Sequence, residues 1–142
     1  PTGTASAVAS VHAALEIVDT RYEAYKFKAA DNIADNSSAA RFVIGPAMVL
    51  PPEADLATLP VRLCADGELL GEGNGADALG HPLAALTWLA ERLLRDGTML
   101  RAGDVVLTGG LTRAFAAQPG MRFSSQVGDP AQGGGEAALR FL

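Results

Sequence analysis

Glu16 is the acidic residue whose surroundings most clearly indicate chemistry. It lies inside an apolar run over residues 12–20, where the β-branched Ile17 and Val18 predict a strand. A lone carboxylate in an apolar strand must be ion-paired, protonated or bound to a cation. Carboxylate oxygens are hard ligands that suit Mg²⁺ or Mn²⁺. The pattern therefore leaves two roles for Glu16, a metal ligand or an ion pair with a cation such as Arg21, and by itself favours the ion pair.

Short polar side chains gather in residues 34–38, which read Ala-Asp-Asn-Ser-Ser. Such side chains can donate and accept hydrogen bonds around a substrate carboxylate. They are also typical of helix caps and turns, and the composition alone favours that structural role. Asn36 and Ser38 are therefore candidates for a binding site that is built on a turn.

Thr108 is a further candidate, because it precedes Gly109 and Gly110 and follows a short apolar run. Residues 105–108 are expected to form a short buried strand, after which the glycines would let the backbone approach a ligand closely. A tight turn explains the same residues equally well. The segment lacks the Gly-x-x-x-x-Gly-Lys spacing of a phosphate loop.

Neither histidine belongs to a recognisable catalytic set. His12 stands alone in a run of small residues, and His81 precedes Pro82, where it would cap a helix. Structural roles are favoured for both. Cys64 lies on an expected strand and reads as a small buried apolar residue. The residue pattern therefore assigns no catalytic residue.

The elements that must position these side chains are mostly strands, with one prominent helix. Asp66-Gly67 is a strong two-residue hairpin signal between two strands. Pro82 begins an apolar stripe at helical spacing, and Gly97 is placed to end that helix. The remaining expected elements are a short helix within residues 5–11, strands over 12–20, 41–45, 61–65, 68–73, 121–127 and 137–141, and the helix itself over 82–94. This pattern predicts a single strand-rich α+β domain over residues 1–142.

Composition excludes several classes of protein. The 142 residues are 49% hydrophobic and 19% charged, which is enough for a packed core. Eleven basic residues against sixteen acidic ones, without a basic run, argue against nucleic-acid binding. The single cysteine excludes an intrachain disulfide, and no apolar stretch approaches the roughly 20 residues of a membrane helix. A cytoplasmic protein is therefore expected.

Four further stretches have an informative order and spacing. They are Ala-Leu-Glu-Ile-Val-Asp-Thr-Arg at 14–21, Ile-Ala-Asp-Asn-Ser-Ser at 33–38, Leu-Gly-His-Pro-Leu at 79–83 with Trp-Leu-Ala at 88–90, and Leu-Arg-Ala-Gly-Asp-Val-Val-Leu-Thr-Gly at 100–109. Together they resemble one family, the hydratase/decarboxylase branch of the fumarylacetoacetate-hydrolase superfamily. Each motif alone is weak, but their order and spacing are specific. The resemblance covers nearly the whole chain.

The resemblance implies a fold, a metal and site residues. The fold would be a mixed β-roll with flanking helices. Members of this branch bind Mg²⁺ or Mn²⁺ through three acidic residues, of which Glu16 matches the last. Ser38 and Asn36 fall in a motif that lines the substrate site, and Thr108 matches the threonine of the final Thr-Gly turn. Glu16 would thus be a metal ligand, and the other three would bind the substrate.

The resemblance also implies an activity, that of a cytoplasmic lyase in aromatic meta-cleavage catabolism. Residues 21–27 and 107–112 are similar to the decarboxylase version of these motifs, which favours metal-dependent decarboxylation of a 2-oxo-enedioate of the 4-oxalocrotonate type to a 2-hydroxydienoate. The alternative is a 2-hydroxypenta-2,4-dienoate hydratase. Either enzyme would form a homo-oligomer or a complex, with the decarboxylase expected to associate with its partner hydratase.

One departure from the family pattern is large. The family's Glu-x-Glu pair and catalytic lysine lie upstream of the segment that begins here, and no Glu-x-Glu precedes Glu16. The chain therefore resembles the C-terminal half of a family member, with the upstream portion absent. A third reading follows, a non-catalytic fragment or subunit that needs an upstream partner chain. One carboxylate rarely holds Mg²⁺ without further ligands.

Overall fold

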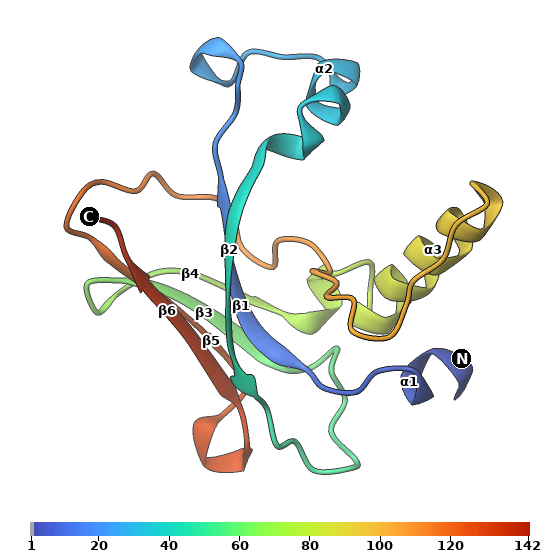
Figure 1. Cartoon of the computed structure of the whole chain (residues 1–142). Helices are drawn as coiled ribbons and strands as arrows, with labels where there is room; N and C mark the ends of the chain where they lie inside the picture. The colour runs from blue at the N-terminus through green and yellow to red at the C-terminus, as the bar shows by residue number, and fades with distance from the viewer. Residues whose placement is uncertain (1) are drawn as a thin grey trace.

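The structure is a computed structural model that describes residues 2–142 (Figure 1). It contains two antiparallel sheets, three short or medium helices and several single 3₁₀ turns. The strands are β1 (His12–Val18), β2 (Ala39–Ala47), β3 (Pro60–Ala65), β4 (Glu68–Asn74), β5 (Arg122–Val127) and β6 (Gly135–Arg140), and the helices are α1 (Thr2–Ser6), α2 (Ala29–Ala34) and α3 (Pro82–Arg95). The strand-rich α+β class predicted from the sequence is confirmed.

The larger sheet has the strand order β4-β3-β5-β6. The hairpin between β3 and β4 turns at Asp66 and Gly67, whose φ angles of 49° and 88° are those of the tight turn that this residue pair favours. The Asp66 side chain also accepts a hydrogen bond from the backbone N–H of Arg122 at 3.0 Å. The turn is thereby joined to the start of β5, and the predicted hairpin is confirmed.

The smaller sheet pairs β1 with β2, and both strands lie against β6 (Figure 1). The two backbones approach each other closely at Gly45, where a Cβ atom would collide with the backbone carbonyl of Glu136. Only a residue without a side chain lets the two backbones come this near.

The core lies where these sheets meet. Leu15 of β1 packs with Ala65 and Phe123, and the ring of Phe123 meets that of Phe141 edge-on at 5.8 Å between centroids. The flanking, partly buried residues are Leu63, Leu70, Phe115, Met121, Leu139 and Phe141. This small apolar cluster fixes β1, and with it Glu16, against the larger sheet.

Helix α3 confirms the predicted helix and both of its ends. The His81 side chain accepts a hydrogen bond from the Leu83 backbone N–H at 3.0 Å, which caps the N-terminus. The chain leaves the helix at Gly97, which has a φ of 77°. Figure 1 shows α3 projecting from the sheets with its far end free. Its exposed face carries Trp88, which is 60% exposed.

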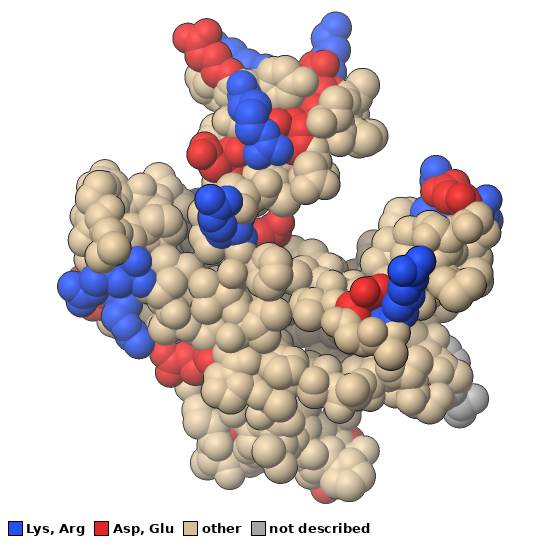
Figure 2. Space-filling model, viewed as in Figure 1, with Lys and Arg blue, Asp and Glu red and all other residues tan. Residues whose placement is uncertain are grey.

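Residues 19–38 form a second projection, here called the arm, which leaves the body between β1 and β2 (Figure 1). Helix α2 and the 3₁₀ turn η2 (Asn36–Ser38) lie in it. Figure 2 shows charged side chains of both signs on the arm, at the end of α3 and at the edge of the body, while the rest of the visible face of the body is largely uncharged. Residues 21–28 of the arm are exposed apart from the partly buried Phe27.

Two local predictions are wrong. Residues 105–108 are not a strand, and Val105 is 60% exposed, because no neighbouring strand pairs with their backbone groups in the described part of the chain. The first helix lies at Thr2–Ser6, earlier than the expected 5–11. None of the helices within residues 2–142 has the length and apolar character needed to cross a membrane.

Candidate functional site

A cavity of about 290 Å³ opens where the arm joins the sheet. It is bordered by the polar side chains Glu16, Asn36 and Arg41 and by apolar residues Ala39, Ala40, Phe42 and Leu107. Two of the residues singled out from the sequence, Glu16 and Asn36, thus meet at one cavity although they are 20 positions apart. Leu107, which precedes the candidate Thr108, lies on the same wall.

Glu16 reaches this cavity because of the alternation of β1. Leu15 points to the core while Glu16, opposite Phe42 of β2, points outward and is exposed. The expectation of a carboxylate inside an apolar environment is therefore wrong, since this side chain is open to solvent. The expected ion pair with Arg21 is also not formed, because Arg21 pairs with Asp35 instead. The Glu16 carboxylate is available to a ligand at the cavity.

Asn36 is held on an unusual backbone. Asn36, Ser37 and Ser38 have φ angles of 52°, 53° and 60°, so three consecutive non-glycine residues adopt the left-handed conformation. Each such residue costs of order 1 kcal/mol relative to an ordinary conformation. The turn persists only if its surroundings compensate for that strain.

Those surroundings centre on the buried carboxylate of Asp35, which is 6% exposed. Its Oδ2 accepts hydrogen bonds from the Thr20 hydroxyl and the Arg21 backbone N–H, both at 3.1 Å, and from the Ser38 hydroxyl at 3.3 Å. Its Oδ1 pairs with Nε of Arg21. One carboxylate therefore ties the end of β1 to both ends of the strained turn.

The charge state of Asp35 follows from these contacts. Burial opposes ionisation, but the Arg21 backbone N–H, the Thr20 hydroxyl and the Arg21 guanidinium outweigh it and hold the pKa of Asp35 below its usual value. The carboxylate is therefore ionised at neutral pH.

Ser38 and Thr108 occupy different places from Asn36. Ser38 is 4% exposed and donates its hydroxyl to Asp35, behind the turn, so it does not border the cavity. Thr108 is half-buried and follows the cavity residue Leu107. Binding of substrate by Asn36, Ser38 and Thr108 stays a prediction.

Sequence reasoning missed two residues of this region. Arg41 borders the cavity and adds a positive charge beside Glu16. Asp35 was recognised only as a cap or turn residue, whereas it is the centre of the network. The signal for Asp35 was the density of short polar groups around it, but the pairing with Arg21 depends on how the arm folds back.

The described residues by themselves supply too few ligands for a divalent cation. Glu16 is the acidic residue at the cavity, and no group of three His, Cys, Asp or Glu side chains comes together within residues 2–142. Divalent cations such as Mg²⁺ need several oxygen ligands. The Glu16 carboxylate fits as one ligand of such an ion, and the described chain alone does not complete the site.

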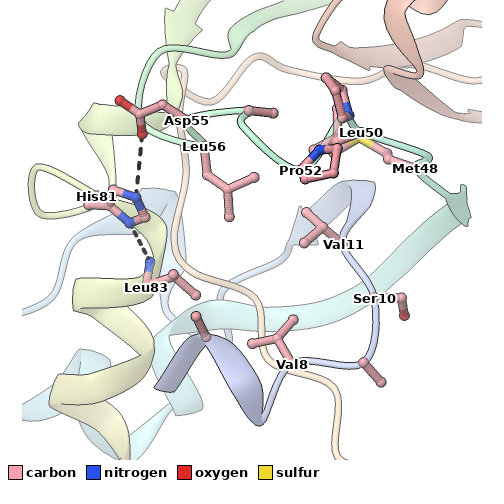
Figure 3. Close-up of a pocket in the computed structure, with 14 residues that line it drawn as sticks. Val8, Ser10, Val11, Met48, Leu50, Pro52, Asp55, Leu56, His81 and Leu83 are labelled. Atoms are coloured by element: carbon pink, nitrogen blue, oxygen red, sulfur yellow. Dashed lines mark hydrogen bonds and ion pairs between the residues drawn. The ribbon is translucent and has the colours of Figure 1, made fainter. Parts of the chain in front are cut away.

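A second, larger cavity of about 550 Å³ lies under the start of α3 (Figure 3). Its wall is largely apolar, with Val8, Val11, Met48, Leu50, Leu56 and Leu83. At its edge His81 uses Nδ1 to accept the Leu83 N–H, and its Nε2 faces Asp55 at 3.5 Å. Both ring nitrogens are thus engaged, which agrees with the structural role predicted for His81.

Comparison with known proteins identifies the family. The family model described as fumarylacetoacetate (FAA) hydrolase C-terminal matches residues 3–137. The chain therefore belongs to the fumarylacetoacetate hydrolase family, as its motifs indicated.

Individual relatives carry two different names. The chain is 45% identical to a 2-keto-4-pentenoate hydratase of Burkholderia vietnamiensis over 86% of this chain and 47% of the relative. It is 37% identical to a 4-oxalocrotonate decarboxylase of Pseudomonas putida over 96% of this chain and 50% of the relative. These names divide along the two activities expected from the motifs.

The solved structures agree. A 4-oxalocrotonate decarboxylase from Pseudomonas putida G7, complexed with magnesium and adipate, matches with a TM-score of 0.83 and 37% identity, over 94% of this chain and 49% of that one. The same enzyme complexed with calcium and acetate matches with a TM-score of 0.80. The chain spans about half the length of the relatives it matches.

Proposed function

We propose that this chain forms part of the active site of a cytoplasmic carbon–carbon lyase that decarboxylates a 2-oxo-enedioate of the 4-oxalocrotonate type. The observation that carries the proposal is the convergence of Glu16 and Asn36 on one cavity. The Pseudomonas putida decarboxylase, which matches 96% of the chain, supports this choice of reaction.

The alternative reaction is hydration, and a specific observation favours it too. The Burkholderia vietnamiensis hydratase is 45% identical to the chain, a higher identity than that of the decarboxylase. The substrates in both names carry a carboxylate next to a keto group. The cavity residues would therefore face the same end of either substrate.

The charges at the cavity define what the chain can contribute. The Asn36 amide can donate a hydrogen bond to a carboxylate or keto oxygen, and Arg41 supplies positive charge. The Glu16 carboxylate repels an anionic substrate unless a cation lies between them. We therefore include a divalent cation, Mg²⁺ or Mn²⁺, with Glu16 as one of its ligands and the others supplied from outside the described chain.

The surface supports a further part of the proposal, a polypeptide partner. The chain exposes 9574 Å². A compact protein of its 14.6 kDa mass exposes about 6,900 Å², so the excess is roughly 2,700 Å². Obligate interfaces bury roughly 2,000–5,000 Å² over both partners, so the excess matches one side of a large one.

We place that partner at α3 and the larger cavity (Figure 3). Trp88 and Leu94 of α3 are 60% and 63% exposed, and the cavity at the base of the helix is apolar. The occupant we propose is the half of the relatives that this chain does not match, joined in one polypeptide or as a separate chain. By itself the chain would then be an inactive subunit, which is the third reading of the sequence.

The test combines this chain with the unmatched half of the Pseudomonas putida decarboxylase as a second polypeptide. Loss of 4-oxalocrotonate and hydration of 2-hydroxypenta-2,4-dienoate are measured with and without Mg²⁺. We expect a complex that decarboxylates in a Mg²⁺-dependent manner. Hydration alone would establish the alternative reaction, and a complex without either activity would support a non-catalytic subunit.

Glu16→Gln is the decisive variant in that complex. It removes the charge of the proposed ligand while preserving the shape of the side chain. Replacing a residue that only supports a metal ligand lowers metal affinity or activity by about 10- to 100-fold. Replacing the ligand itself should therefore lower turnover by at least about 100-fold. Glu68→Gln changes an exposed carboxylate at the start of β4 and serves as the matched control. Equal activity of the two variants would show that Glu16 is not a metal ligand needed for turnover.

A further inference from the structure

The left-handed turn that carries Asn36 has no glycine to relieve its conformation. We propose that Asp35 is a positioning residue, which holds this turn so that Asn36 borders the cavity. This inference deepens the proposed function and rests on it for the identity of the ligand. The conformational part stands on the contacts of Asp35 alone.

The contacts reach Asp35 from both sides of the turn. Thr20 and Arg21 approach from the segment after β1, and Ser38 approaches from the turn itself. A carboxylate can accept several hydrogen bonds at once, and an ionised one makes stronger bonds than a neutral group. No other type of side chain of this size could satisfy these donors together.

Arg21 extends the same network to the strands on either side. Its guanidinium donates to the carbonyl of Asp35, to that of Asp19 at 3.1 Å and to that of Ala39 at 3.4 Å. The Asp19 N–H also donates to the Ser38 carbonyl at 2.8 Å. The first residue after β1, Asp19, and the first residue of β2, Ala39, are thereby fixed relative to the turn.

The position of the turn explains why such a network is useful. Asn36 borders the cavity, while Asp35 and Ser38 lie behind it, out of contact with the cavity. Strained backbone that is held by buried contacts is typical of functional sites, where it fixes a side chain in place before the ligand arrives. Asp35 therefore acts through Asn36 and not on a ligand directly.

The test uses nuclear magnetic resonance on the isolated chain. The ¹³Cα shifts and the backbone ³J couplings of residues 36–38 report whether their φ angles are positive. In Asp35→Asn we expect these values to move to those of extended or averaged backbone, while the shifts of β3 and β5 stay unchanged. Retention of the left-handed values in this variant would overturn the inference, as would a uniform change throughout the chain.

Asp129→Asn is the matched control. Asp129 also accepts a backbone hydrogen bond within a short turn, from Ala131 at 2.9 Å, but it is exposed and lies in the connection between β5 and β6. It should leave residues 36–38 as they are. If Asp35→Asn does not fold, Thr20→Val is used instead, because it removes one hydrogen-bond donor to Asp35 and keeps the charge of the carboxylate. A partial shift in the NMR values of residues 36–38 then supports the inference, and unchanged values contradict it.

Oxalate separates this inference from the proposed function. Added with Mg²⁺ to the complex of this chain with the unmatched half of the Pseudomonas putida decarboxylase, it probes the Asn36 side-chain amide as a small dicarboxylate. A response that is lost in Asp35→Asn and kept in Asp129→Asn supports positioning when the β3 and β5 resonances of Asp35→Asn stay unchanged, because a general loss of stability would shift those resonances as well. Absence of any response in the wild type counts against substrate binding at Asn36, while the conformational readout still decides the role of Asp35.

Discussion

The larger sheet and the arm are held together by different forces. The sheet is built on apolar packing around Phe123 and Ala65. Within residues 19–38, all of which the structure describes, the two buried residues are the polar Asp35 and Ser38. Apolar packing is non-directional and tolerates small adjustments, whereas a hydrogen-bonded carboxylate fixes direction and depends on its charge. The sheet therefore provides stability, and the arm provides a defined geometry at the cavity.

The largest effect is expected from Phe123→Ala, which removes a buried ring from the sheet. It deletes the edge-on contact with Phe141 and leaves a cavity in a small core. We expect the free energy of unfolding in urea to fall by about 3 kcal/mol or more. A loss well under about 1 kcal/mol would mean that the apolar cluster is not what holds the sheet.

An intermediate effect is expected from acid, and it should act on the arm first. The pKa of Asp35 is lowered in the folded state, so its ionised form stabilises the fold above the unfolded value of about 3.9. That contribution is lost as the pH falls below about 4 and through the lower folded pKa. Ring resonances of Tyr22 and Tyr25, both in the arm, should therefore shift before those of Phe123. If the Tyr and Phe123 resonances shift over the same pH range, the idea that the arm is held by interactions separate from those of the sheet would be contradicted.

The smallest effect is expected from Glu72→Gln on the sheet. Glu72 lies 3.5 Å from Arg62, but both side chains are more than half exposed, so solvent screens the pair. We expect the free energy of unfolding to change by at most about 0.5 kcal/mol. Comparison with the loss caused by Asp35→Asn then shows whether the buried pair of Asp35 and Arg21 contributes more to stability than the exposed pair of Glu72 and Arg62. A large loss from Glu72→Gln would contradict that distinction.

Local signals explain which parts of the fold were predictable. The Asp66-Gly67 turn and helix α3, which begins at Pro82 and ends before Gly97, each depend on residues that are close in sequence, and both were predicted. Residues 105–108 have the composition of a strand, but a strand also needs a neighbour, which composition does not reveal. The prediction failed for that reason.

The candidate site was predictable to the extent that its residues carry motifs. Glu16 and Asn36 were both identified, and the structure brings them to one cavity. The exposure of Glu16 depends on which face of β1 meets the core, and the pairing of Arg21 with Asp35 depends on how the arm folds. These are tertiary relations, so a pattern of residue types did not distinguish Glu16 from Asp35 as the partner of Arg21.

Gly45 has a consequence for any experiment that maps function by tolerance to substitution. Every other residue would place a Cβ against the Glu136 carbonyl, so the position is closed to all side chains where β2 crosses β6. A complete substitution scan would mark Gly45 as severely as Glu16, although Gly45 does not border the cavity. At Gly45 even alanine would be harmful, and the harm would persist in an assay that measures folding alone. Substitutions of Glu16 would lower activity but would have no effect in that folding assay.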